Sequence, residues 1–254
     1  MRATQEILSV WNGFNKFPME TLTKAWYYPR ANGNKQRDIT LMKEHYEAYG
    51  ITGNCFDLAL WLLHEFKSNG IHAYPIGHHL NTEKAHVAII AVNEEGNRYF
   101  CDLGDQWLQP ILIDSNSENF TEDILSGFFP AADIQVKSHG NHIDISYHRP
   151  NGKISRQLFE ANEIGMESFL EAAEISQSII KPKPLLECRI PFKNEIAHWE
   201  FYDWKAFLST TEGIIYEPSI DSIEEWIELL NEKTGYNKQF LFEALEAYKQ
   251  ISQK

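Results

Sequence analysis

The chain has 254 residues, of which 43% are hydrophobic and 13% aromatic, enough to bury a substantial core. Its formal net charge of −13 comes from 36 acidic against 23 basic residues. Because a surface of that sign repels phosphate groups and no run of basic residues interrupts it, the sequence predicts no nucleic-acid partner and no anionic-membrane binding.

The sequence contains no stretch approaching the roughly 18 apolar residues of a membrane-spanning helix. Residues Met1–Val10 lack the apolar core of a signal peptide. The three cysteines, Cys55, Cys101 and Cys188, are too few and too widely spaced for a disulfide framework or a Cys-x-x-Cys metal site. We therefore expect a cytoplasmic protein with reduced thiols.

The first part of the sequence predicts helices. Residues Thr4–Trp11 carry apolar side chains at helical spacing, and a second helix is expected over Thr40–Tyr49, ended by Gly50. The run Cys55–Phe66 is apolar almost all round, which is typical of a helix buried inside a domain. Gly70 follows it as a helix stop.

From Ile71 onward the pattern changes to short β-like runs separated by turns. The links Asn93–Asn97 and Arg149–Lys153 each contain a glycine next to an asparagine, as hairpin turns often do. The expected strands are Ile71–Ile76, His86–Val92, Arg98–Asp102, Ile134–Lys137, His142–His148 and Ile154–Phe159.

The rest of the chain mixes helices with strands. A stiff Lys-Pro-Lys-Pro hinge, Lys181–Pro184, separates a helix at Met166–Ile175 from the last part. Further strands are expected at Leu185–Phe192, around Glu200–Phe207 and at Gly213–Tyr216, followed by helices at Ser222–Asn231 and Gln239–Gln250. Helices, then a sheet-rich middle, then mixed elements predict an α+β fold rather than an alternating parallel one.

Three residues in the order nucleophile, imidazole and carboxylate carry the functional signal: Cys55, His86 and Asp102. A thiol reacts as its thiolate, and the first turn of a helix stabilises an anion through its free amides and dipole. Those amides would also serve as oxyanion donors. His86 and Asp102 are equidistant from Glu94 in the expected turn, so a hairpin places them opposite or offset by one step. Cys101 points to the other face.

The carboxylate would then hold one ring nitrogen of His86 while the other faces Cys55.

The alternative interpretations of these and other residues are weaker. A lone cysteine in an apolar helix is usually inert packing. The adjacent His78 and His79 point to opposite faces of a strand with no further ligand, so no metal site is expected. No Gly-rich phosphate loop is present, so no cofactor-binding residue is assigned.

These residues resemble the motifs of the arylamine N-acetyltransferases, within the papain-like and transglutaminase-like cysteine superfamily. Gly53–Leu58 is similar to the Gly-x-Cys-Phe-x-Leu nucleophile motif, and Tyr99–Gly104 to the Asp-Val-Gly turn. Phe14–Lys24 resembles the Pro-aromatic-Glu-Asn segment. The chain departs from the family at Ile51–Gly53, where the family usually has Arg-Gly-Gly, and at Met19 and Thr21.

The resemblance implies an N-terminal helical bundle over 1–70, a central antiparallel β-barrel over 71–180 and a C-terminal α/β lid over 181–254. It also implies a ping-pong acyltransferase with acetyl-CoA as acyl donor and an arylamine or other small amine as acceptor. Cys55 would be the nucleophile, His86 the acid–base and Asp102 the orienting residue. Two alternatives stay open: a transglutaminase-like thiol hydrolase or amide-forming enzyme on the same triad, or a non-catalytic relative.

Overall fold

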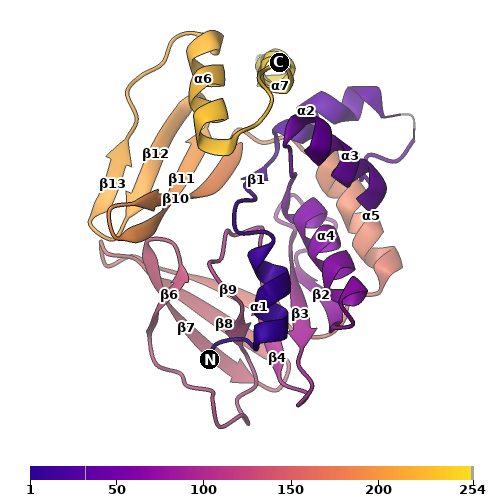
Figure 1. Ribbon diagram of the computed structural model, residues 1–254, viewed down its shortest axis with the longest axis vertical. Helices are drawn as coiled ribbons and strands as arrows, with labels where there is room; N and C mark the ends of the chain where they lie inside the picture. The colour runs from indigo at the N-terminus through magenta and orange to yellow at the C-terminus, as the bar shows by residue number, and fades with distance from the viewer. Residues whose placement is uncertain (32, 253–254) are drawn as a thin grey trace.

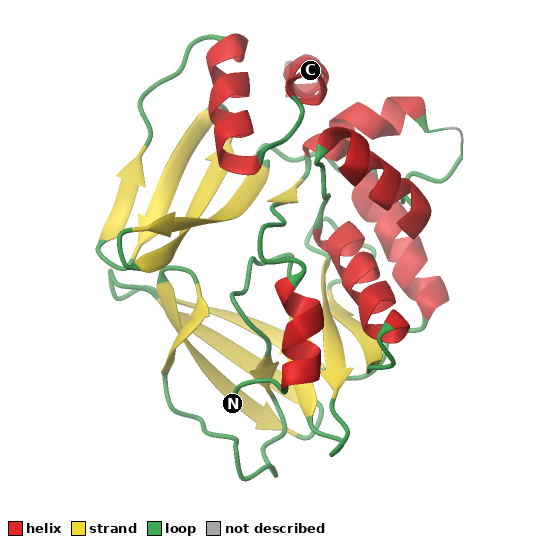
Figure 2. Cartoon of the chain, viewed as in Figure 1, coloured by secondary structure: helices red, strands yellow, loops and turns green. Residues whose placement is uncertain are grey.

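The computed structural model describes residues 1–31 and 33–252. Three antiparallel sheets form the frame, with helices grouped at one side and one end (Figures 1 and 2). The expected α+β class is confirmed. No helix in the described part of the chain is long and apolar enough to cross a membrane.

The helices gather into two groups (Figure 1). One group lies beside the sheet that carries β3, and the other covers the C-terminal sheet. The helices are α1 (Gln5–Asn12), α2 (Leu22–Tyr27), the short 3-10 helix η1 (Tyr28–Arg30), α3 (Ile39–Tyr49), α4 (Cys55–Ser68), α5 (Met166–Gln177), α6 (Ile223–Thr234) and α7 (Lys238–Ser252).

Each sheet is an antiparallel ladder of neighbouring strands. The first contains β2 (His72–His78), β3 (His86–Val92), β4 (Arg98–Cys101) and β5 (Ile111–Leu112). The second contains β6 (Leu125–Phe129), β7 (Ala132–His139), β8 (His142–His148) and β9 (Ile154–Glu160). The third contains β1 (Met19–Glu20), β10 (Leu186–Phe192), β11 (Glu195–Tyr202), β12 (Lys205–Thr210) and β13 (Gly213–Tyr216).

Within the described residues none of the three sheets closes on itself, so the expected central β-barrel is not observed. The two four-stranded sheets remain separate ladders, with no backbone pairing between β2 and β9 where they lie next to each other. A closed barrel requires a continuous ladder of hydrogen bonds around the ring, and that condition is not met here.

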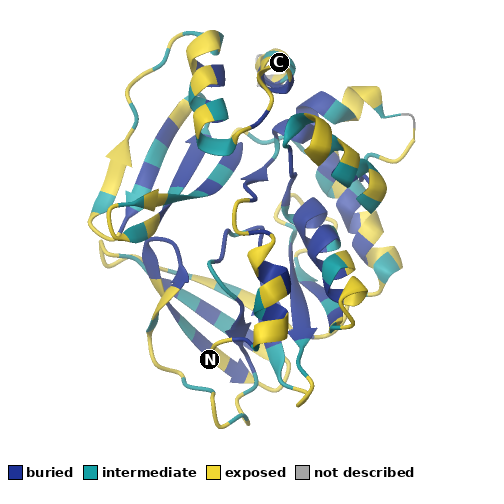
Figure 3. Cartoon of the chain, viewed as in Figure 1, coloured by how far each residue is buried: buried dark blue, intermediate teal, exposed yellow. Residues whose placement is uncertain are grey.

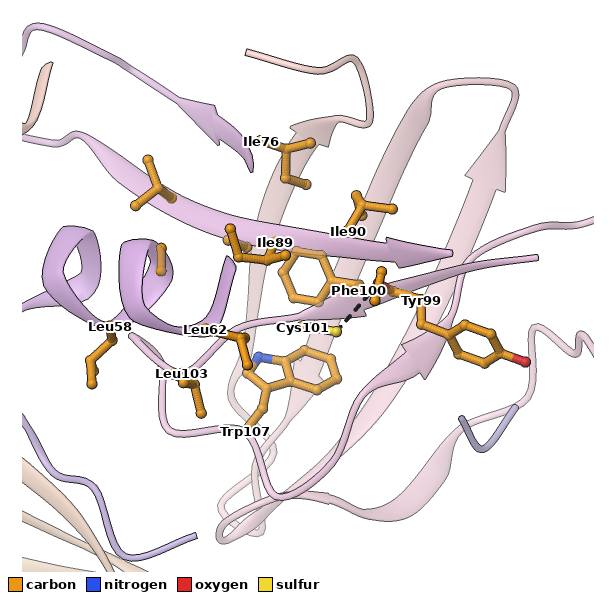
Figure 4. Packing of buried hydrophobic residues seen from close by; sticks show 14 of the residues in the cluster. Leu58, Leu62, Ile76, Ile89, Ile90, Tyr99, Phe100, Cys101, Leu103 and Trp107 are labelled. Carbon is orange, nitrogen blue, oxygen red and sulfur yellow. Dashed lines mark hydrogen bonds between the residues drawn. The ribbon is translucent and has the colours of Figure 1, made fainter. Parts of the chain in front are cut away.

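The buried run that begins at Cys55 forms α4, which packs on β2 and β3. Strand β3 is buried over nearly its whole length, and α4 buries most of its N-terminal part while its C-terminal end is partly exposed (Figure 3). Side chains of α4 and of the β3–β4 hairpin interlock in the main hydrophobic core, where Leu62, Ile89 and Trp107 lie close together (Figure 4). This packing fixes the start of α4 against the hairpin, which is where the candidate site lies.

The boundaries of several expected elements are confirmed to within a few residues, and β3 and β8 match their predicted ranges. One correction concerns the region around Glu200–Phe207. A turn at Asp203 and Trp204, both at positive φ, divides it between β11 and β12. The short strands β1, β5 and β6 and the helix α2 were not predicted, because they are too short or too irregular to give a periodic pattern.

Candidate active site

The structure brings Cys55, His86 and Asp102 together. His86 Nε2 lies 2.7 Å from Asp102 Oδ2, and Asp102 is fully buried. The Cys55 thiol lies next to the His86 ring, and their interaction raises the pKa of His86. Because Nε2 is held by Asp102, Nδ1 is the ring nitrogen left for the sulfur. The sulfur at the start of α4, the imidazole on β3 and the buried carboxylate after β4 are therefore neighbours in space, in that order.

The hairpin register differs slightly from the expected one. Ile89 pairs with Cys101 and Val92 with Arg98, so the hairpin is centred one residue later than Glu94. His86 and Asp102 are consequently not directly opposed, and Asp102 follows the last residue of β4. Of the two predicted arrangements, directly opposed or offset by one step, the structure shows the offset one. Both side chains lie on the same face of the hairpin and form a hydrogen bond.

Cys55 is the first residue of α4, and Asn54 caps the helix. Asn54 Oδ1 accepts from the amides of Phe56 and Asp57 at 2.8 and 3.3 Å, and Asp57 Oδ2 accepts from the Asn54 amide at 3.1 Å. This capping box fixes the direction in which the chain enters the helix, and with it the position of the thiol. From the sequence, several first-turn amides are expected to be free as oxyanion donors. Two of them, those of Phe56 and Asp57, donate to the cap, whereas the Cys55 amide donates to no described residue.

A buried arginine supports this helix start. Arg37 is 2% exposed; its Nη2 donates to the Thr52 carbonyl at 2.8 Å and lies 3.3 Å from Asp57 Oδ2. A Cβ on Gly53 would lie 2.5 Å from Arg37 Nη2 and 2.3 Å from Asp57 Oδ2, and Gly53 has a φ of +123°. Only glycine lets the backbone pass between this ion pair and the nucleophile. The segment before Cys55 thus contacts a guanidinium although it carries none itself.

Two glutamines complete the network. Gln36 Nε2 donates to Asp57 Oδ1 at 2.9 Å, and Gln177 Nε2 donates to Gln36 Oε1 at 2.9 Å. Gln177, the last residue of α5, also accepts from Asn54 Nδ2 at 3.0 Å. The helix start that presents Cys55 is therefore bound from two separate parts of the chain, the loop with Gln36 and Arg37 and the end of α5, which is typical of a site whose geometry must not move.

The charge state of His86 follows from its neighbours. Burial lowers the pKa of His86, but the carboxylates of Asp102 and Asp105 outweigh it and raise that pKa well above its usual value. The two carboxylates therefore favour the imidazolium form of His86 next to the sulfur in the free enzyme. This arrangement suits a thiolate–imidazolium pair.

The other two cysteines have a different environment. Cys101 is buried beside Trp107 in the hydrophobic core, with its sulfur 3.5 Å from the Tyr99 carbonyl (Figure 4). Burial raises the pKa of Cys101, and raises that of Cys188 to about 12. Both thiols are therefore held in the protonated, unreactive form, in agreement with the expectation that Cys101 faces away from the site.

A cavity of about 300 Å³ opens onto Cys55 and His86. Its lining includes Lys24 and Asp105, two residues not assigned to the site from the sequence. Lys24 is buried there, and its Nζ donates to the Ser176 carbonyl at 2.8 Å. Burial lowers the pKa of Lys24. Asp105 lies 3.7 Å from His86 Nε2 through Oδ1. Only the turn after Asp102, in which the Asp105 amide donates to Asp102 Oδ1 at 3.0 Å, directs Asp105 into the cavity.

A larger cleft of about 610 Å³ lies between the second and third sheets. It shares Asp105, Lys183 and Glu187 with the smaller cavity. The β8–β9 hairpin brings Arg149 and Lys153 into its lining, on the Arg149–Lys153 turn expected from the sequence. These cations could not be assigned beforehand, because nothing in the sequence indicates what this turn faces.

Two groups of described residues bring ligand-type atoms within 4.8 Å of one another. One is His86, Asp102 and Asp105, the site itself. The other is Glu187, His198 and Glu200, where Lys183 Nζ already lies 3.6 Å from Glu200 Oε1. An ammonium beside the second group opposes the binding of a metal cation there.

Replacing Gly104 with alanine is expected to lower any thiol-dependent activity by about 100-fold or more, because small displacements of reacting groups cost about that much. A Cβ at this position would lie 2.6 Å from the Cys55 Cβ and 3.0 Å from His86 Cε1. The measurement is the rate of Cys55 alkylation by iodoacetamide, read by mass. Gly165→Ala is the matched control, since its Cβ would meet no atom within 4 Å. An unchanged rate in Gly104→Ala would contradict the close approach.

No protein-family model and no curated protein sequence matches this chain. Solved structures do match it. The arylamine N-acetyltransferase of Mycobacterium marinum in complex with CoA has a TM-score of 0.65 at 8% identity, over 92% of this chain and 88% of that one. The enzyme from Salmonella typhimurium has a TM-score of 0.66 at 11% identity, over 97% and 100%.

A third match is an arylamine N-acetyltransferase from Bacillus cereus, whose structure reveals a Cys-His-Glu catalytic triad; it has a TM-score of 0.64 at 12% identity, over 92% of both chains. The fold of this chain is therefore the fold of the arylamine N-acetyltransferases. The resemblance expected from the sequence motifs is confirmed at the level of the fold.

Proposed function

We propose that this protein is an acyltransferase that moves an acetyl group from acetyl-CoA, through a thioester on Cys55, to a small amine. The observation that carries the proposal is the contact of Cys55, His86 and Asp102 within the arylamine N-acetyltransferase fold. Fold likeness alone would not indicate chemistry, because one fold can serve many functions. A nucleophile, a base and an orienting carboxylate in contact supply the missing part of the argument.

Each residue has a defined role in the proposed reaction. The Cys55 thiolate attacks the thioester carbonyl of acetyl-CoA, and His86 gives its proton to the leaving CoA thiolate. His86, now neutral, later accepts a proton from the attacking amine. Asp102 holds Nε2 of His86 so that the other nitrogen faces the sulfur. The Cys55 amide, which has no described acceptor, is the proposed donor to the oxyanion.

The larger cleft is the proposed site of the acyl donor. CoA carries phosphates, and Arg149, Lys153 and Lys183 supply cations along the cleft. The aromatic rings of Phe129 and Phe207 in the same lining suit its adenine. The structure from Mycobacterium marinum was solved with CoA, which supports the same class of donor here.

The experiment is incubation of the protein with acetyl-CoA, followed by intact-mass analysis and peptide mapping. We expect one acetyl group, located on Cys55 and absent from Cys55→Ala. Cys188→Ala is the matched control, because its thiol is buried and held protonated, and it is expected to acetylate like the wild type.

The outcomes separate the proposed function from its alternatives. An adduct that an amine discharges supports the transferase. An adduct that water discharges as fast as any amine favours a thiol hydrolase on the same triad. The absence of an adduct, with ordinary reactivity of Cys55 toward iodoacetamide, favours a non-catalytic relative and would sink the proposal.

A further inference from the structure

The cavity beside Cys55 is rich in charged residues. Its lining carries six charged side chains, Lys24, Glu83, Asp105, Lys181, Lys183 and Glu187, and among the described residues His86 supplies its only aromatic ring. Aromatic ligands are usually held by apolar and aromatic walls, so this lining is poorly suited to an aromatic amine. The charged side chains instead suit a polar or charged ligand.

The lysines of the cavity already have protein partners. Lys24 Nζ donates to the carbonyls of Ser176 and Ile179 at 2.8 and 3.3 Å. Lys181 Nζ donates to the Glu83 carbonyl, and Lys183 Nζ lies 3.6 Å from a carboxylate oxygen of Glu200. Cationic groups are therefore largely compensated by the protein. The same is true of Glu187, whose carboxylate lies 3.2 Å from His198 Nε2.

Asp105 shares its cationic neighbour, His86, with Asp102. Its Oδ2 accepts from Gln157 Nε2 at 2.6 Å, but its Oδ1 accepts no hydrogen bond from any residue that the structure describes. The nearest donor is His86 Nε2 at 3.7 Å, and that nitrogen already bonds Asp102 at 2.7 Å. The Asp105 side chain is 27% exposed and lines the cavity. A partly buried carboxylate oxygen without a donor favours a cationic ligand.

We propose that the acceptor is a small aliphatic amine, bound as its ammonium ion by Asp105 Oδ1 beside the Cys55 thioester, rather than an arylamine. This inference rests on the proposed acyltransferase function and names the acceptor class of the same site. An aliphatic amine is cationic at neutral pH and gains from a carboxylate contact. An aniline is neutral at that pH and gains little.

Asp105 also supplies the base that an ammonium needs. The ammonium gives one proton to the Asp105 carboxylate, and the resulting amine attacks the thioester carbonyl, forming the C–N bond. As the C–S bond breaks, a second proton passes from nitrogen to neutral His86. The products are the amide, the Cys55 thiolate, the His86 imidazolium and protonated Asp105, which loses its proton to the open cleft. Burial raises the pKa of Asp105, which favours its acceptance of a proton.

The test uses the acetyl-enzyme itself. Protein acetylated on Cys55 by acetyl-CoA is freed of CoA, mixed at neutral pH with either 2-aminoethanol or aniline, and followed by loss of the acetyl mass. We expect 2-aminoethanol to discharge the wild-type acetyl-enzyme faster than aniline. In Asp105→Asn its second-order rate constant is expected to fall at least about tenfold, whereas that of aniline changes less than about threefold.

The comparison of two acceptors separates substrate binding from effects on His86. Both amines attack the same thioester with the same His86, so a change acting only through His86 would slow both equally, and that result would overturn the inference. The matched control is Asp133→Asn, an exposed aspartate on β7 outside both cavities, which is expected to behave like the wild type.

Failure of the inference and failure of the proposed function give different results. Faster discharge by aniline than by 2-aminoethanol overturns the inference and leaves the transferase standing. Absence of any acetyl group on Cys55 in the first step overturns the proposed function, and the inference with it.

Discussion

Replacing Asp102 with asparagine is expected to lower acetyl transfer by about 10³- to 10⁴-fold while leaving the fold intact. The buried Asp102 carboxylate holds His86 Nε2 at 2.7 Å. An asparagine in its place can donate its NH₂ to Nε2, which fixes the wrong ring tautomer: Nδ1 then carries the proton and cannot accept one from Cys55. The measurement is kcat/KM for acetyl transfer, with circular dichroism to verify folding. A loss below tenfold would contradict the orienting role of Asp102.

The same variant gives a second, independent readout. Asp102 is the largest of the contributions that raise the pKa of His86, so we expect this pKa to fall in Asp102→Asn. A raised folded-state pKa stabilises the protein below the unfolded value of about 6.5, and this stabilisation is lost as the pH rises through the raised value. The loss of folding stability as the pH is raised should therefore be smaller in Asp102→Asn than in the wild type. NMR titration of the His86 ring, with urea unfolding across the same range, checks both expectations.

Replacing Arg37 with methionine is expected to lower the free energy of unfolding by about 3–5 kcal/mol, because it leaves a buried carboxylate without its partner. Arg37 and Asp57 have side chains only 1% and 2% exposed, and their closest charged atoms are 3.3 Å apart. Urea denaturation measures the effect. A weak or absent acetyl-transfer activity in the folded fraction is also expected, because the pair supports the helix start that carries Cys55.

A second variant keeps that prediction testable if Arg37→Met folds poorly. In Arg37→Met/Asp57→Asn the unpaired charge is removed, so the double variant should be more stable than Arg37→Met alone. The exposed pair Lys193–Glu212 is the matched control; Lys193→Met should change stability by less than about 1 kcal/mol. Equal instability of Arg37→Met and the double variant would show that the two charges are not energetically coupled.

Local patterns in the sequence were sufficient for the elements that carry the reactive residues. The apolar run after Asn54 defined α4, and β3 begins at His86 as predicted, because a long buried helix and a buried hairpin strand leave strong periodic signals. The diagonal contact of His86 with Asp102 lay within the predicted range, although the turn was centred one residue later than expected. Hairpin geometry is local, so a short stretch of sequence specifies it.

Other parts of the site have no such signal. Gln36 and Arg37 precede Cys55 by many residues in an irregular loop, and Gln177 ends a helix much later in the chain, yet all three bind the same helix start. Only packing brings such distant polar groups together. The predicted division of the chain at residues 70 and 180 stays a prediction.

The sequence by itself determined the α+β class, the nucleophile's helix and the hairpin that joins an imidazole to a carboxylate, because these depend on spacing between neighbours in the chain. The tertiary structure decided that the sheets stay open, that Arg37 contacts the start of α4 and that Asp105 lines the same cavity as Cys55. Those features depend on which surfaces meet when the core closes. Residues far apart in the chain share a site only through that packing, and no local pattern encodes it.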